Sequence, residues 1–195
     1  AISLETESWG ELIDPFDGQK DLHHGLIRTL HQNSFIDDST RMLRAVRYAQ
    51  RLGFQLAPKT EQLIRRDLIY LDCIKGDRIR HEFQRIFLEP RASRILEMAQ
   101  AVDVLSAINP GLIISDRVLN KLHRISIEPE ADRELFFLSI LTYSTPSTEL
   151  PKLISRINMS SQWANVSRDT GEIKRTLDYF NDVDILPSQI HDHLN

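Results

Sequence analysis

The chain has 195 residues, of which 41% are hydrophobic and 27% charged, and its formal net charge is −4. This length is enough for one large or two small cores, and the composition favours a soluble globular protein. The apolar runs are only a few residues long, which excludes a membrane-spanning helix, and the lone Cys73 excludes an internal disulfide and a cysteine-rich zinc site. We expect Cys73 to be a buried, inert thiol. Because no basic segment followed by an apolar one opens the chain, we also expect a cytoplasmic protein.

The first thirty residues are predicted to be extended. Short apolar pieces at residues 2–4, 11–13 and 26–30 are separated by Asp-Pro and Asp-Gly pairs, which are typical of turns. Three such pieces are too few for a stable sheet of their own. We therefore expect the edge of a sheet whose other strands lie outside this chain.

From residue 38 onward the pattern is helical, and the first helix is predicted over residues 38–52, with Gly53 as its end. At 100° per residue, one side of this helix is apolar and the opposite side is basic. We expect the apolar side to be buried and the basic side to be exposed. The apolar set is Met42, Ala45, Val46, Ala49 and Leu52, and the basic set is Arg41, Arg44, Arg47 and Arg51.

The rest of the chain is predicted to be helical as well, so the expected fold class is mostly α with a few leading strands. Proline, glycine and apolar spacing set the expected boundaries. Loops are expected at residues 144–147 and 181–187. The further helices are expected at residues 58–74, 77–89, 92–107, 115–125, 129–143, 149–157 and 160–180, with a last one from residue 187.

The start of the helix at residues 38–52 has two interpretations. In the first, Asp37 or Asp38 caps the helix, and Asp37 pairs with Arg41 one turn later. In the second, Asp38 and Arg41 read a nucleobase: the carboxylate accepts from an exocyclic amino group, and the guanidinium donates to the adjacent ring nitrogen. Cytosine and adenine offer that edge, whereas uracil and guanine offer the reverse. Spacing alone favours the cap.

Three longer motifs favour the second interpretation, in which Asp38 and Arg41 read a nucleobase. DDSTRMLRAVRYAQRLGF at residues 37–54 closely resembles the nucleotide-selecting motif of the bacterial-type (class II) tRNA nucleotidyltransferases and poly(A) polymerases. GELIDPFDGQKDLHHGLIRTL at residues 10–30 looks like the family's strand-and-loop segment, and GDRIRHEFQRIF at residues 76–87 is similar to its Glu-Arg-Ile-Arg-x-Glu motif. The opening AISL also matches the continuation of a further family motif. The clear resemblance covers about residues 1–110.

The resemblance implies an internal fragment of such an enzyme. Residues 1–30 would be the C-terminal edge of the nucleotidyltransferase head domain, residues 31–95 the nucleotide-selecting and RNA-binding neck, and residues 96–195 the helical body with the start of the tail. The parent protein would add C and A, or A alone, to an RNA 3′ end such as a tRNA acceptor end. It would use CTP or ATP as substrates and Mg²⁺ as cofactor, without a membrane partner.

The resemblance also implies that this fragment alone does not catalyse. The family's metal-binding Asp-x-Asp pair precedes the nucleotide-selecting helix, and no such pair precedes Asp37. Asp182 and Asp184 match the letters, but they lie in an expected loop without a glycine-rich segment before it. We therefore expect Mg²⁺ to be held by the part of the head domain that precedes residues 1–30, and no metal or catalytic residue within the chain. The histidines show no metal-ligand spacing either.

The resemblance assigns roles to two sets of residues. Asp38 and Arg41 would read the base, and Arg44 and Arg47, on the same exposed side, would help to bind the nucleotide. Three further groups of residues belong to the supporting motifs. Asp14, Gly18 and Asp21 would couple head and neck, or form an ordinary turn and helix cap, and Asp37 stands where the family more often has Glu. For Arg78, Arg80 and Glu82, a salt bridge that supports the neck helix is favoured over contact with substrate.

Two further observations bear on partners. Residues 37–94 hold 13 basic and 8 acidic residues, whereas the remainder is acidic, as expected for a local phosphate-facing surface. Trp9 and Trp163 are expected in the core or at a docking surface. Two other interpretations remain open: a stand-alone helical RNA-binding module without catalysis, and a structural helical scaffold, which predicts no discrimination between nucleotides.

Overall fold

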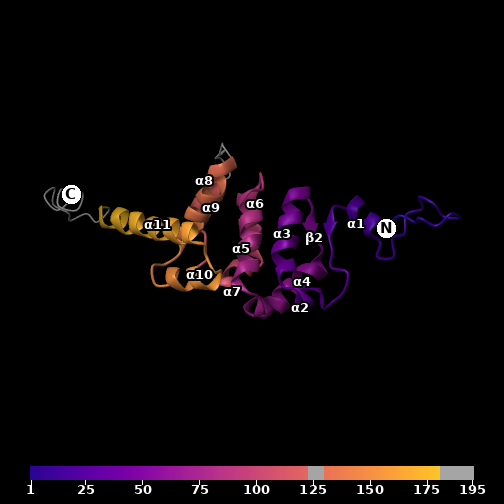
Figure 1. The fold of residues 1–195 in the computed structure, drawn as a ribbon, viewed down its shortest axis with the longest axis horizontal. Coiled ribbons are helices and arrows are strands. Elements are labelled where there is room, and N and C mark those ends of the chain that lie inside the picture. Colours follow the sequence, from indigo (N-terminus) through magenta and orange to yellow (C-terminus); the bar gives the residue numbers. More distant parts are fainter. Residues whose placement is uncertain (123–129, 181–195) are drawn as a thin grey trace. The chain divides into compact units, whose positions relative to one another are not determined.

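The structure is a computed structural model, and it describes residues 1–122 and 130–180 (Figure 1). The described part is mostly helical with two short strands, so the predicted fold class is confirmed. The chain divides into two compact units, each described by itself. The first unit comprises Ala1–Ile74 and Glu89–Ala107, and the second comprises Lys75–Leu88 and the described residues from Ile108 onward. The domain boundaries expected after residues 30 and 95 stay predictions.

Extended backbone is present in the first thirty residues, as expected, although little of it forms a sheet. Ile2 and Leu12 form an antiparallel bridge, in which the Ser3 N–H donates to the Glu11 carbonyl at 2.8 Å. Strand β1 (Leu26–Ile27) pairs in parallel with β2 (Gln55–Leu56), a strand that the sequence pattern did not predict. Trp9 is 72% exposed, so it does not lie in a core.

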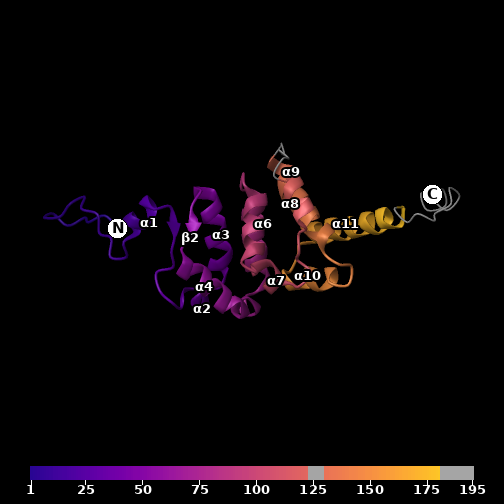
Figure 2. The same cartoon turned by 180° about the vertical axis from the view of Figure 1, so that it is seen from behind.

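The first unit is built around α3. Its helices are α1 (Gly18–His23), α2 (Ser34–Asp37), α3 (Thr40–Leu52), α4 (Pro58–Asp67) and α6 (Ala92–Ala101), with the 3₁₀ helix η1 (Leu68–Cys73) after α4 and the short α7 (Val104–Ile108) at the end. Figure 2 shows β2 next to α3, and α3 also packs against α6. The predicted apolar side of α3 is buried, with Met42, Val46 and Ala49 fully inside.

Several details of the first unit differ from the predictions. Leu52 is 52% exposed, because it is the last residue of α3 and Gly53 ends the helix at φ 69°. Cys73 is exposed, not buried. The helix predicted to reach residue 74 becomes η1 at Leu68, and the helix predicted over residues 92–107 is interrupted at Asp103, whose φ is 63°.

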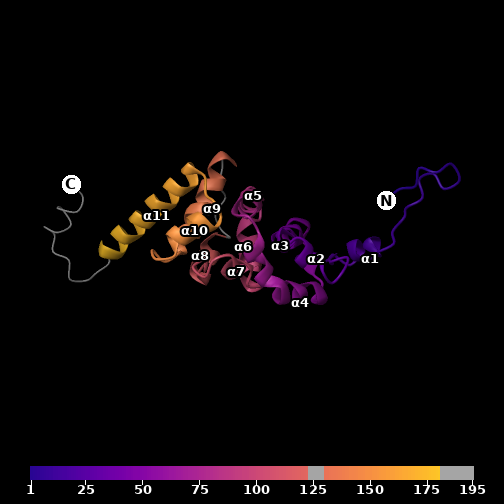
Figure 3. The same cartoon turned by 60° about the horizontal axis from the view of Figure 1, so that its bottom comes forward.

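The second unit consists of five helices in the described residues: α5 (Gly76–Phe87), α8 (Asp116–Leu122), α9 (Glu130–Ser144), α10 (Leu150–Arg156) and α11 (Ser161–Phe180). Helix α11 packs along α9 and against α10, as Figure 3 shows. The core of the second unit contains a cluster of aromatic rings. The Phe87 ring centroid lies 5.7 Å from that of Phe83, 6.1 Å from that of Phe137 and 5.7 Å from that of Trp163. Trp163 is therefore a core residue.

Some predicted features fall outside the described residues. These are the end of the helix expected over residues 115–125, the loop at residues 181–187 with Asp182 and Asp184, and the helix expected from Pro187. Among the residues that the structure does describe, the helices are too short or too polar to cross a bilayer.

Candidate functional site

A hollow of about 350 Å³ in the first unit brings together part of the predicted nucleotide site. Helix α3 contributes Arg41, Arg44 and Tyr48, while the segment after β1 contributes Arg28 and His31. Arg41 and Arg44 are both exposed. Two of the four predicted nucleotide-binding residues therefore lie on one concave surface that is lined by several cations.

Asp38 lies at the start of α3, where it caps the helix. Its Oδ1 accepts hydrogen bonds from the Thr40 backbone N–H at 3.1 Å and from the Thr40 hydroxyl at 2.7 Å. Its backbone is extended, with φ −154° and ψ 98°. This is the geometry of an N-cap residue, whose side chain satisfies a backbone donor that the first turn leaves free. The bonds to Thr40 agree with the capping interpretation of Asp38, and its role in base reading stays a prediction.

Arg41 is connected to α2. Its Nη1 donates to the carbonyl oxygen of Ser34 at 3.2 Å. The Asp37 carboxylate lies 3.6 Å from Nε2 of His31, a contact that is an ion pair only when the imidazole is protonated, whereas the predicted partner was Arg41. The bond to Ser34 orients the Arg41 side chain at the wall of the hollow, because Ser34 also lines it.

Arg47 does not lie on an exposed surface, so this part of the prediction is wrong. Its side chain is 8% exposed, and its Nη1 lies 3.1 Å from Oε1 of Glu89, which is 10% exposed. Arg51 lies 3.7 Å from the same carboxylate. Helical spacing alone placed Arg47 with the other arginines. Its burial depends on Glu89, which lies 42 residues away and cannot be paired with it from the sequence.

Tyr48 is a residue of the hollow that the sequence analysis did not single out. It follows Arg44 at i+4 and Arg41 at i+7, so it shares their side of α3. The Arg47 guanidinium carbon lies 4.6 Å from its ring centroid. Hydrogen bonding and charge from Arg47, followed by those from Arg44, lower the pKa of the Tyr48 hydroxyl below its ordinary 10. The helical spacing was the signal that could have identified it.

The segment with Asp14, Gly18 and Asp21 forms a capped turn followed by an ion pair. The backbone N–H groups of Gly18 and Gln19 each donate to the Asp14 carboxylate at 2.8 Å. Asp17 has φ 56° and ψ 32°, a left-handed conformation that glycine adopts without a steric penalty. Asp21 binds Nε of Arg28 at 2.9 Å. A role in coupling domains stays a prediction.

We expect the Asp14 carboxyl to titrate below pH 3.8 in the folded chain. Hydrogen bonds from the backbone of Gln19, and then of Gly18, hold the pKa of Asp14 below that ordinary value. A lowered folded pKa stabilises the capped turn above the unfolded pKa, and this contribution is lost as pH falls through the folded value. Carboxyl ¹³C NMR measures the midpoint, with the same chain unfolded in urea as control. Equal midpoints in the two states would contradict the cap.

The third motif supports the second unit. Arg80 forms an ion pair with Asp77 at 2.8 Å and donates to the Asn158 carbonyl, and the Asn158 side chain donates to Asp77 at 2.9 Å. Glu82 is 4% exposed and accepts from Arg85 at 2.6 Å. Arg78 is exposed. Both ion pairs lie within α5, and it is the hydrogen bonds of Asn158 with Arg80 and Asp77 that join α5 to the segment after α10. A role of these residues in supporting the neck helix stays a prediction.

Within residues 1–122 and 130–180, no three His, Cys, Asp or Glu side chains are grouped as a metal site would require. The expectation that Mg²⁺ is held outside this chain stays a prediction.

Comparisons with known proteins agree with the resemblance seen in the motifs. Residues 53–114 match the family model described as the probable RNA and SrmB-binding site of polymerase A. The A-adding tRNA nucleotidyltransferase of Geobacter sulfurreducens is 36% identical over 117 residues, 59% of this chain and 13% of that enzyme. The CCA-adding enzyme of Geobacillus stearothermophilus is 37% identical over 112 residues, 56% of this chain and 28% of that enzyme.

Solved structures extend the likeness to most of the chain. A tRNA nucleotidyltransferase complexed with a primer tRNA and an incoming ATP analogue has a TM-score of 0.70 and 28% identity, covering 94% of this chain and 58% of that one. An apo CCA-adding enzyme has a TM-score of 0.75 and 26% identity, covering 91% of this chain and 44% of that one. The chain thus spans less than half the length of the two curated relatives. The resemblance seen in the motifs is confirmed: the chain is similar, in sequence and in fold, to part of the CCA-adding and A-adding tRNA nucleotidyltransferases.

Proposed function

We propose that this chain is the nucleotide-selecting and RNA-contacting part of an RNA nucleotidyltransferase that adds A, or C and A, to the 3′ end of tRNA or another RNA. The observation that carries the proposal is the hollow beside α3, where Arg41 and Arg44 line the same surface as Arg28 and Tyr48. The relatives support the reaction class, since they are named as CCA-adding and A-adding enzymes.

In this proposal, guanidinium groups do most of the nucleotide recognition. Arg41 donates to a ring nitrogen of cytosine or adenine, and its bond to Ser34 keeps the donor in place. Arg44 binds phosphate oxygens, for which its planar fork is suited. Asp38 accepts from the exocyclic amino group while it caps α3. Arg47 acts indirectly, because it is buried against Glu89 and contacts Tyr48 instead of the hollow.

RNA contact is proposed for the basic surface of the first unit. Exposed arginines of α3 and of the segment after β1 offer phosphate contacts that would weaken as salt is raised. The chemical step requires divalent metals on carboxylates, and we propose that Mg²⁺ is held by another part of the same protein. A cytoplasmic location also stays a prediction, which cell fractionation would test.

The 195-residue chain is expected to bind ATP and CTP at least several-fold more tightly than GTP and UTP. The reason is the edge of the base: only adenine and cytosine present an amino group beside a ring acceptor to an Asp and Arg pair. Calorimetry with each of the four triphosphates measures this, and shifts of the Arg44 and Tyr48 amides locate the site. Equal affinity for all four triphosphates would exclude base reading by this chain, as the scaffold interpretation predicts.

Arg41→Ala tests base selection more cleanly than Asp38→Ala does. The Asp38 substitution also removes a helix cap, which costs about 1 kcal/mol of stability. We expect Arg41→Ala to bring the four affinities within about twofold of one another. Arg94→Ala, which removes an exposed arginine paired with Glu97, is the matched control and should leave selectivity intact. In the full-length protein, nucleotide addition distinguishes an enzyme from a stand-alone RNA-binding module, which would bind RNA but extend nothing.

A further inference from the structure

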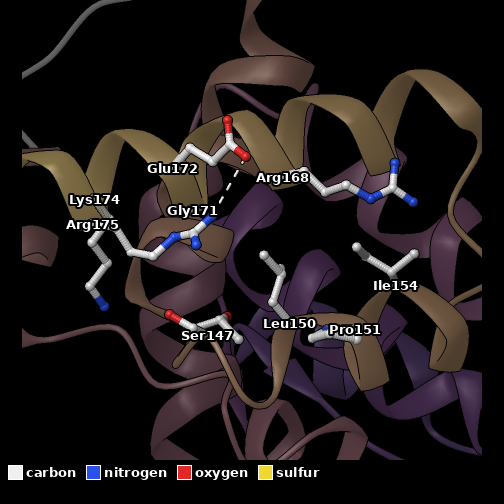
Figure 4. Close-up of a pocket in the computed structure, with 10 residues that line it drawn as sticks. Ser147, Leu150, Pro151, Ile154, Arg168, Gly171, Glu172, Lys174 and Arg175 are labelled. Atoms are coloured by element: carbon white, nitrogen blue, oxygen red, sulfur yellow. Dashed lines mark ion pairs between the residues drawn. The ribbon is translucent and has the colours of Figure 1, made fainter. Parts of the chain in front are cut away.

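A second hollow, of about 410 Å³, lies in the second unit between α10 and α11 (Figure 4). Its floor is apolar and comes from Leu150, Pro151 and Ile154 of α10. The wall opposite this floor is polar and comes from α11. A volume of this size is within the range of sites for small molecules, which bury most of such a ligand in one concavity.

The wall from α11 is positively charged. Arg168 and Arg175 are seven residues apart, so they lie on the same side of the helix about 10.5 Å apart along its axis. Lys174 adds a third cation, and Glu172 is the one acidic residue among the described residues that line the hollow. Glu172 lies 3.6 Å from Arg175, as the dashed line in Figure 4 marks, but both side chains are about two-thirds exposed. Such a pair is weak, and Arg175 can exchange it for an anionic ligand.

Gly171 leaves the middle of this wall open. It lies between Arg168 and Arg175 on α11, where glycine costs about 1 kcal/mol relative to alanine. A Cβ atom at this position would be 3.2 Å from Cδ2 of Leu150. The glycine thus allows α11 to approach α10 closely, and it leaves the space between the two arginines free of side chain.

We propose that this hollow binds one unpaired nucleotide of an RNA strand. The apolar floor suits the face of a base, and guanidinium groups bind phosphate and also stack on bases. The hydroxyl of Ser147, at the rim, can bond to a ribose. This site goes beyond the nucleotide choice proposed for the first unit, because it shares no residue with that hollow. The group that this hollow would bind is a nucleoside phosphate, which occurs both in an RNA strand and in a free nucleotide. The test therefore compares an RNA strand with a free nucleotide.

The test is an NMR titration of the 195-residue chain with AMP, adenosine, inorganic phosphate and single-stranded tetra-adenylate. We expect AMP and tetra-adenylate to shift the Ser147 and Gly171 amides, with tetra-adenylate binding more tightly. Adenosine and phosphate should each bind at least tenfold more weakly than AMP, because each fills only half of the site. Phosphate binding as tightly as AMP would overturn the proposal, and so would AMP binding without tetra-adenylate binding.

Variants assign the effect to this hollow. Arg168→Gln with Arg175→Gln should weaken tetra-adenylate binding at least tenfold, and Ser147→Trp should weaken it similarly by filling the space from an exposed position. The control is Arg94→Gln with Arg117→Gln, which removes two exposed charges elsewhere. An equal loss in the control would contradict a specific site. The Arg44 and Tyr48 amides report the first hollow separately, so either proposal can fail alone.

Discussion

Glu89→Ala is expected to destabilise the first unit by about 3–5 kcal/mol, the usual cost of removing one partner of a buried ion pair. Glu89 is the carboxylate that faces Arg47 at 3.1 Å, and both side chains are at least nine-tenths buried. Without Glu89, the Arg47 charge stays buried and loses the carboxylate that neutralises it. Exchange of the α3 and α6 backbone amides with deuterium measures the effect, because it reports the opening of this unit alone.

Two comparisons show whether charge or packing causes the loss. Arg47→Met with Glu89→Leu removes both charges and should recover most of the stability, since an apolar pair of similar volume replaces a buried ion pair at little cost. Arg94→Ala removes one partner of the exposed pair with Glu97, and it should cost less than about 1 kcal/mol. If Glu89→Ala were as mild as Arg94→Ala, the buried pair would not hold α3 in place.

Phe87→Ala is expected to destabilise the second unit by about 3–5 kcal/mol, the range for removing a fully buried phenylalanine. Phe87 has no exposed surface, and its ring contacts those of Phe83, Phe137 and Trp163. Truncation loses the area buried from water and leaves a cavity that these rings cannot fill. Emission of Trp163 during urea unfolding measures the loss, in a Trp9→Phe background that removes the other tryptophan.

Ile113→Ala is the control for Phe87→Ala. Ile113 belongs to the same unit but is 59% exposed, so its truncation should change the unfolding free energy by no more than about 0.5 kcal/mol. An unchanged urea midpoint in Phe87→Ala would mean that the aromatic cluster is not the core of this unit. Following each unit with its own probe avoids a single unfolding free energy, which is not well defined for two units that open separately.

The helices were predictable from sequence because their signals are local. The apolar residues of α3 recur at 3.6-residue spacing, Gly53 supplies the left-handed end, and Pro58 opens α4. The errors in the helices are local as well. The break at Asp103 was not predictable from its residue type, because Asp adopts the left-handed backbone more often than most residues but far less often than glycine.

Pairings between distant parts of the chain were not predictable in the same way. Strand β2 is two residues long, and its pairing with β1 joins segments 29 residues apart, so no periodicity marks it. Arg47 and Glu89 illustrate the same limit within the candidate site. Helical spacing assigns a residue to a side of its helix, but whether that side faces water depends on what packs there.

The sequence by itself determined the family resemblance, the mostly helical fold and the arginines of α3, because motifs and helical periodicity are properties of neighbouring residues. The tertiary structure alone decided which of those arginines line a hollow. It places Arg41 and Arg44 beside Tyr48, buries Arg47 against Glu89 and gives Asp38 a capping bond to Thr40. The physical reason is that burial and partners come from segments far apart in the chain, which fold together only when their cores form.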